Sequence, residues 1–151
     1  CSKEEAKITL SGVDDKPGVA AAIFGPLSES GINVDMIIQN ISENNSTDLT
    51  FSCPSSQVLE AEEAIKMASK KKEISFKTHI IDTNVAKVSL VGIGMRSHTG
   101  IAKKMFEALA NENINILVIS TSEIKISILV EQKYMELAVQ TLHDAFELEK
   151  T

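Results

Sequence analysis

Hydrophobic residues near the start of the chain first alternate with polar ones and then recur at helical spacing. Ile8 and Leu10 are separated by a single residue, which predicts a strand with one buried face. After a polar loop, apolar residues recur at i, i+3, i+4 and i+7, as they do on the buried side of a helix. These residues are Ala20, Ile23, Phe24 and Leu27.

The next residues predict a hairpin, a second helix and a last strand. Residues 32–40 and 47–53 are strand-like segments joined by the polar turn SENNS. The second helix has its own apolar face. It comprises Val58, Ala61, Ile65 and Ala68. Alternating Ile74, Phe76 and Ile80 then predict a fourth strand, so the predicted order is β-α-β-β-α-β.

The pattern of residues 7–37 returns in residues 87–119, with two extra residues in the loop before the helix. Matched pairs are Gly18/Gly100, Gly31/Asn113 and Asn33/Asn115. Gly31 and Asn113 stand where each helix exits, and they are the residue types that best tolerate a left-handed C-cap. The second copy continues through a hairpin to another helix with apolar spacing. That helix contains Met135, Ala138, Val139, Leu142 and Phe146.

Two such copies predict an α+β fold of two tandem ferredoxin-like units. Each unit is expected to have an antiparallel sheet backed by helices, and the second lacks its fourth strand in this chain. Residues 1–82 and 83–151 are the expected domains. Gly25-Pro26 interrupts the first helix, where proline costs about 3 kcal/mol, so a bend or a displaced turn is expected there.

Composition narrows the function classes. The chain has 43% hydrophobic residues, 4% aromatic residues and a net charge of −6, which argues against a nucleic-acid ligand. No apolar run approaches the roughly 20 residues of a membrane helix, so we expect a cytoplasmic protein without a membrane partner. Cys1 and Cys53 lie far apart, which supports neither a disulfide framework nor a metal site. Cys53 is expected in the core, and the charged opening CSKEEAK without Met suggests a segment of something longer.

Catalytic motifs are not recognisable in this sequence. Gly92, Gly94 and Gly100 fall short of the dinucleotide fingerprint because Ser97 stands at its third glycine. A P-loop is excluded because Gly100 is not followed by Lys and Ser/Thr. The three histidines have no nucleophile beside them in a known arrangement, so no catalytic residue is predicted.

A repeated loop is more informative, because it ends in glycine at a predicted helix N-terminus in both copies. Free N–H groups there favour a carboxylate, and Gly18 and Gly100 allow a small ligand to approach. Asn33 and Asn115 offer donors and acceptors. In the first copy Asp14, Asp15 and Asp35 could face an ammonium group. A small zwitterion would suit this arrangement. The alternative is purely structural: Pro17-Gly18 starts a helix, Asp14 or Asp15 caps it, and the asparagines turn corners.

Longer runs carry a specific resemblance. They are ITLSGVDDKPGVAA, INVDMIIQNIS, TDLTFSCP, KVSLVGIGMRSHTGIA, NINILVISTSEIKIS and AVQTLHDAF. Together they resemble the C-terminal regulatory region of bacterial aspartate kinase, which is a pair of ACT domains. The likeness extends from about Lys7 to Phe146, in the family's order.

The resemblance implies a feedback sensor for an enzyme that phosphorylates L-aspartate with ATP. The kinase domain, which binds ATP and Mg, is absent from this chain, so no cofactor is expected here. Expected partners are lysine and/or threonine, the kinase domain or subunit, and a second copy in a homodimer through the ACT domains. Effectors in the family bind at interfaces between ACT domains. The implied effector-binding residues are Asp15, Lys16, Pro17, Gly18, Val19, Ala20, Asn33, Asp35, Gln39, Ser97, His98, Thr99, Gly100, Asn115, Ile116, Thr121 and Ser122.

Further features of the family bear on regulation. The run from Ser120 to Glu123 resembles part of the effector-sensitive interface, and changes at Ser42, Thr47 and Thr50 would relieve feedback inhibition. Leu117 stands where the first copy has Asp35, so the two sites need not bind the same amino acid. The segment CSKEEA is too short and polar to supply the second unit's missing strand, so that sheet should be incomplete or completed by a neighbour.

Two other functions remain open at this point. One is an ACT regulator of another amino-acid pathway, of the acetolactate synthase small-subunit type. The other is a ferredoxin-like nucleic-acid binder, against which the negative charge and the scarcity of aromatic residues already argue.

Overall fold

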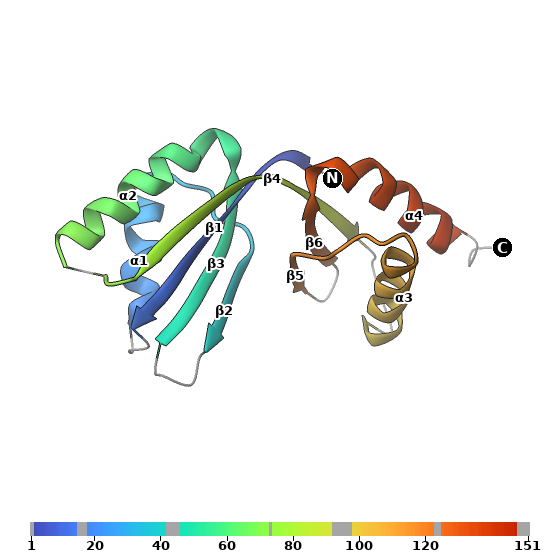
Figure 1. Ribbon diagram of the computed structural model, residues 1–151, viewed down its shortest axis with the longest axis horizontal. Helices are drawn as coiled ribbons and strands as arrows, with labels where there is room; N and C mark the ends of the chain where they lie inside the picture. Colours follow the sequence, from blue (N-terminus) through green and yellow to red (C-terminus); the bar gives the residue numbers. More distant parts are fainter. Residues whose placement is uncertain are drawn as a thin grey trace. The chain divides into compact units, whose positions relative to one another are not determined.

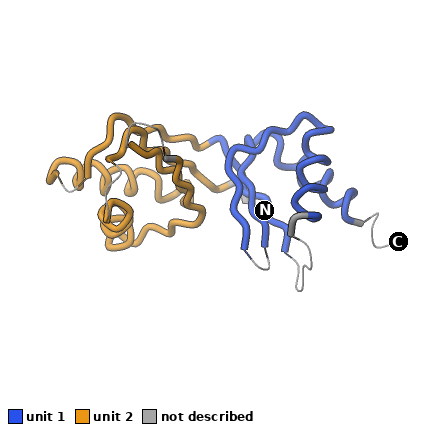
Figure 2. Tube along the Cα trace, turned by 90° about the horizontal axis from the view of Figure 1, so that it is seen from below, with its two compact units in different colours: residues 1–3, 84–151 blue, residues 4–83 orange. Residues whose placement is uncertain are grey.

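The computed structural model describes residues 2–14, 18–41, 46–72, 74–91, 98–122 and 125–147 (Figure 1). The chain forms two compact units, one of residues 4–83 and one of residues 1–3 with 84–151 (Figure 2). The described part contains no helix that is long and apolar enough to span a membrane. Strand order in the sheet is β2 (Ile37–Ile41), β3 (Ser46–Pro54), β1 (Ser2–Asp14), β4 (Thr78–Val91), β6 (Lys125–Glu131) and β5 (Val118–Thr121).

The unit of residues 4–83 packs two helices against one face of its strands (Figure 1). Its elements are β1 (Ser2–Asp14), α1 (Val19–Glu29), β2 (Ile37–Ile41), β3 (Ser46–Pro54), α2 (Val58–Lys70) and the first part of β4 (Thr78–Val91). Ile8 pairs with Phe51, and Phe51 pairs with Ile37 in the antiparallel ladders. The order β-α-β-β-α-β is therefore the one predicted.

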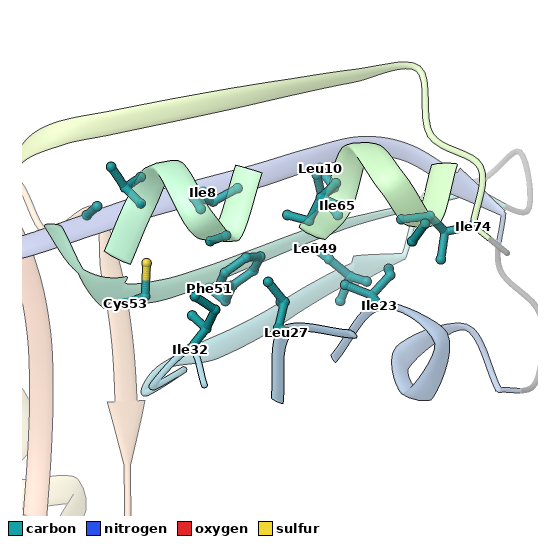
Figure 3. Close-up of a cluster of buried hydrophobic side chains, with 14 of the residues drawn as sticks. Ile8, Leu10, Ile23, Leu27, Ile32, Leu49, Phe51, Cys53, Ile65 and Ile74 are labelled. Atoms are coloured by element: carbon teal, nitrogen blue, oxygen red, sulfur yellow. The ribbon is translucent and has the colours of Figure 1, made fainter. Parts of the chain in front are cut away.

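The core of this unit contains side chains from both helices and the central strands, which point toward one another in Figure 3. Ile23 and Leu27 of α1 are buried, as the helical spacing predicts. Phe24 meets Phe51 edge to face, with ring centroids 5.6 Å apart, a favoured aromatic arrangement. All four predicted positions of α2 are buried, whereas Ala20 lies at the exposed edge of α1.

A bulge in β1 keeps the strand's apolar residues on the core side. The ladder with β3 shifts between Leu10 and Val13, and both residues are fully buried. Gly12 takes φ +70 within this bulge, and its N–H donates to Asp48 Oδ1 at 3.1 Å. A β-carbon at Gly12 would lie 2.7 Å from Lys77 Cγ, so glycine is required there both by conformation and by space.

The unit that contains residues 84–151 repeats this plan. Its elements are the second part of β4, α3 (His98–Asn111), β5 (Val118–Thr121), β6 (Lys125–Glu131) and α4 (Met135–Glu147). The core is built by apolar side chains of β4, β6, α3 and α4, among them Met105, Leu109 and Leu142. Phe106 is 38% exposed and lies at the edge of the predicted helix face. The fold class predicted from the sequence is confirmed.

The two helix exits match as predicted. Gly31 and Asn113 both take positive φ, 76° and 56°. Beyond them, the N–H of Ile32 donates to Leu27 O at 3.0 Å, and the N–H of Ile114 donates to Leu109 O at 2.9 Å. This bond closes the last turn with a left-handed residue, as in a Schellman C-cap.

The last strand of the first unit differs from its prediction. Residues 74–77 are not a strand, and β4 instead runs without a break from Thr78 to Val91, through the predicted boundary after residue 82. Because the alternation restarts at Thr78, Ile81 packs against the core, and Ile80 is 59% exposed. The prediction that Ile80 lines the buried face is wrong.

Two further boundaries differ from the predicted ones. β2 begins at Ile37 rather than near residue 32, although Asp35 N already donates to Ser52 O at 2.9 Å. α1 continues through Pro26 as one helix, so no turn is displaced there, and the expected bend stays a prediction. Gly25 explains the tolerance, because a residue without a β-carbon avoids the clash that proline makes with the residue before it. Ser2 and Lys3, at the start of β1, group with residues 84–151.

Candidate effector-binding site

The N-terminus of α1 has no side-chain cap among the residues that the structure describes. Its N-cap is Gly18, in the left-handed conformation with φ +85, rather than Asp14 or Asp15. The first helical hydrogen bond is donated by Ala22 N to Gly18 O at 3.0 Å, and no acidic residue lies in the first turn. The N–H groups before Ala22 precede the helical ladder, and the glycine cap has no side chain to accept from them.

Gly18 itself has room around it among the described residues. A β-carbon built on Gly18 would meet nothing within 4 Å. Val19 is half-buried against the core, while Ala20 is exposed beside it. Asp15, Lys16 and Pro17, which the sequence places in the same loop, lie outside the described residues. The described part of the loop thus presents helix N–H groups and positive dipole to solvent, as a carboxylate site requires.

The predicted residues before β2 lie at the other end of α1. Asn33 N donates to Gln57 Oε1 at 2.8 Å, and Gln57 Nε2 donates to Gly31 O at 3.0 Å. Gln57 therefore fixes the backbone of residues 31–33 just after the helix C-terminus. The side chains of Asn33 and Asp35 are exposed there. Gln57 was not predicted, because a side chain that bonds to backbone 26 residues away leaves no local signal.

Gln39 lies closer to the start of α1. It pairs with Leu49, and two residues further along Ile41 pairs with Thr47, which in turn pairs with Val13. β2 thus runs from the helix C-terminus back toward the loop that enters α1. The helix of 11 residues is about 16 Å long at 1.5 Å per residue. Gly18 and Asn33 are consequently separated by the length of α1, and one unit does not bring the predicted residues into one pocket.

In the second unit, the glycine that corresponds to Gly18 has a different position relative to its helix. Gly100 is the third residue of α3, which starts at His98, so it does not precede the helix as predicted. Ser97 and the side chains of His98 and Thr99 lie outside what the structure describes. The loop is two residues longer than in the first copy, and this length allows the helix to begin earlier relative to its glycine.

Beyond α3, Asn115 is exposed and Ile116 packs against the core. Leu117 N donates to Leu129 O at 2.8 Å, the counterpart of the Asp35–Ser52 bond. Thr121 and Ser122 are exposed at the end of β5, where Ser122 N donates to Lys125 O at 2.7 Å. Ser122 therefore closes the β5–β6 turn, a structural role that the predicted site did not include.

Two threonines that the resemblance connects with feedback lie on β3. Thr47 is fully buried and its Oγ1 donates to Asn40 O at 2.9 Å, which ties the edge strand β2 to the sheet. Thr50 Oγ1 lies 3.2 Å from Thr9 Oγ1. The matched pair Ser89 and Ser127 repeats this hydroxyl contact at 2.8 Å in the second unit. Ser42 lies outside the described residues.

Two hollows and two groups with shifted pKa values involve none of the predicted site residues. One hollow of about 570 Å³ is lined by Asn84, Glu131, Gln132 and Lys133, and another of about 360 Å³ lies beside α2; neither includes a predicted site residue. Burial, together with nearby Glu5, raises the pKa of Cys53 to about 11. A hydrogen bond from His79, at 2.9 Å, lowers the pKa of Glu62. These groups belong to the scaffold.

The repeated fold defines a class of protein. Residues 8–66 and residues 88–146 each match the ACT domain family. The chain is therefore a tandem pair of ACT domains.

Comparison with whole proteins is more specific. The chain is 53% identical over 98% of its length to the aspartokinase of Pseudomonas aeruginosa, and 49% identical over 98% to that of Helicobacter pylori. It spans 35% and 36% of these curated relatives, about a third of their length.

Solved structures cover the same region. A crystal structure of aspartokinase alpha and beta subunits gives a TM-score of 0.87 at 46% identity, covering 96% of this chain and 94% of that one. The ligand-free regulatory subunit of aspartate kinase from Thermus thermophilus gives 0.86 at 38% identity, covering 95% and 93%. The chain belongs to the aspartokinase family and corresponds to its regulatory part.

Proposed function

We propose that the chain senses end-product amino acids, lysine and/or threonine, and thereby inhibits the phosphorylation of L-aspartate by ATP in an attached or associated kinase part. The observation that carries this proposal is the open N-terminus of α1. Among the described residues, Gly18 gives the first-turn N–H groups no side-chain cap, and a β-carbon at Gly18 would meet nothing within 4 Å. The α-carboxylate of an amino acid is a ligand of the right charge and size for this position.

The rest of the ligand is held, in this proposal, by a second ACT unit. Gly18 and Asn33 lie at opposite ends of α1, so a small amino acid does not reach both within one unit. The exposed Asp35 carboxylate and the amide of Asn33, both from a second copy of the chain, would meet the ammonium group. A site that is complete only across an interface couples ligand binding to subunit arrangement.

Inhibition follows from that coupling. An effector that binds one subunit arrangement more tightly shifts the population toward it by its difference in affinity. A homodimer through the ACT domains supplies the two arrangements, and the kinase part, with its ATP and Mg, responds to them. We place the protein in the cytoplasm, where these amino acids are made.

A paired substitution tests the site. Asp35→Asn removes the proposed ammonium partner, and Glu29→Gln removes the same charge from another exposed position of the unit. Titration calorimetry with L-lysine and L-threonine should show at least tenfold weaker binding in Asp35→Asn, with Glu29→Gln unchanged. Equal affinity in both variants would remove Asp35 from the site, and absence of binding in the unsubstituted chain would count against the sensor itself.

A further inference from the structure

The outward face of α2 exposes large apolar side chains. Leu59 is 73% exposed and Met67 is 54% exposed. Between α2 and the end of α1 lies a shallow groove of about 360 Å³. It is lined by Ser30, Leu59, Glu60, Glu63, Ala64 and Met67. Clustered apolar groups of this kind, rimmed by charge, are typical of an interaction surface.

Charges on the same face are separated along the helix. Glu60 and Glu63 are exposed in the first half of α2, and Lys66 and Lys70 are exposed in the second half. Lys66 Nζ lies 3.7 Å from Glu62 Oε1 and remains 48% exposed, so it can also reach a partner. The acids are at the positive end of the helix dipole and the bases at its negative end, which stabilises the separation within one chain.

The charge pattern along α2 is complementary to that of a second α2 that runs in the opposite direction. We infer that α2 is a docking surface for α2 of a second copy, packed antiparallel about a twofold axis near Ala64. In that arrangement Leu59 of one copy lies beside the partner copy's groove near Met67, and Glu60 and Glu63 lie opposite Lys66 and Lys70. A parallel arrangement brings like charges together, so the charge pattern selects the antiparallel one.

The chain's own repeat serves as a comparison. α2 and α4 are both 13 residues long and follow a three-residue 3-10 turn, so their positions correspond one to one. The counterparts of Leu59, Ala64 and Met67 are Glu136, Thr141 and Asp144, and those of Glu63, Lys66 and Lys70 are Gln140, His143 and Glu147. At these matched positions α4 therefore has neither the apolar residues nor the separated charges, and its exposed Leu137 and Val139 correspond to Glu60 and Glu62 of α2. The surface is a property of α2, not of the fold.

The first test replaces two exposed apolar residues of α2 with their counterparts in α4. Sedimentation equilibrium of the 151-residue chain, up to about 1 mM because one helix pair is a small interface, should show a concentration-dependent association step. The double variant Leu59→Glu with Met67→Asp should lose that step. Leu137→Glu, a matched change at an exposed position of α4, should retain it. A chain that shows no association over this range, or an association step unchanged in the double variant, overturns the inference.

A charge exchange distinguishes this face from any other contact between copies. Variant A carries Glu60→Lys with Glu63→Lys, and variant B carries Lys66→Glu with Lys70→Glu. Each alone should lose the α2 association through repulsion, and an equal mixture should regain it as a heterodimer. Wild-type association in A and in B, or a mixture that regains nothing, contradicts antiparallel pairing and assigns the face to another occupant, such as the kinase part.

Discussion

The helix exit at Gly31 provides a sharp test of the structural account. Gly31 has φ +76, and a β-carbon there would meet nothing within 4 Å, so Gly31→Ala changes backbone strain without a steric clash. An L residue in this conformation costs about 1–2 kcal/mol. Loss of unfolded-state freedom offsets roughly 0.4–1 kcal/mol. The free energy of unfolding of the variant should therefore be about 0.5–1 kcal/mol lower than that of the unsubstituted chain.

Urea and thermal unfolding followed by circular dichroism measure this change. A loss of 1 kcal/mol corresponds to a Tm shift of about 2–4 °C for a chain of this size. The matched control is Asn113→Gly, at the same exit of the second unit with φ 56; it relieves strain and should not destabilise. If Gly31→Ala is as stable as the unsubstituted chain, the left-handed cap is not a determinant of this exit.

Other predictions concern the sheet, an ion pair and a thiol. Thr47→Val should lower the free energy of unfolding by about 1 kcal/mol, since the hydroxyl of the fully buried Thr47 no longer donates to Asn40 O of β2; Thr50→Val, whose hydroxyl partner is half-exposed, should cost less in the same urea assay. The hydrogen bond from His79 lowers the folded-state pKa of Glu62 below its ordinary 4.5, so its stabilisation is present above that pH and is lost as the pH falls. Glu62→Gln should thus destabilise at pH 7 and have little effect at pH 3, and an equal loss at both would contradict the assignment. With the other cysteine replaced, Cys53, whose pKa is about 11, should react with a thiol reagent at pH 8 only after unfolding, and rapid native-state labelling would contradict its burial.

Local features of the fold are readable from the sequence. The apolar spacing of α2 identifies all four of its buried residues, because helical periodicity is set within one turn. Gly31 and Asn113 identify two helix exits, because few residues adopt positive φ. Such signals depend on neighbouring residues alone.

Features that depend on distant segments are not readable in this way. Ile80 is exposed because residues 74–77 are not a strand, and that interruption shifts the alternation. Gln57 binds backbone far away in the sequence, which no spacing rule identifies. The separation of Gly18 from Asn33 follows from the length and direction of α1, which the sequence motifs that suggested these residues do not reveal.

The most direct test of the sensor is thermal unfolding of this chain with L-lysine, L-threonine, both together, and L-leucine as the control. A ligand at about 100 times its Kd should add roughly 2.7 kcal/mol, a shift of several degrees. The account predicts a higher Tm with lysine or threonine and an unchanged Tm with leucine. An unchanged Tm with all of them, or an equal rise with leucine, would contradict selective binding of an end product.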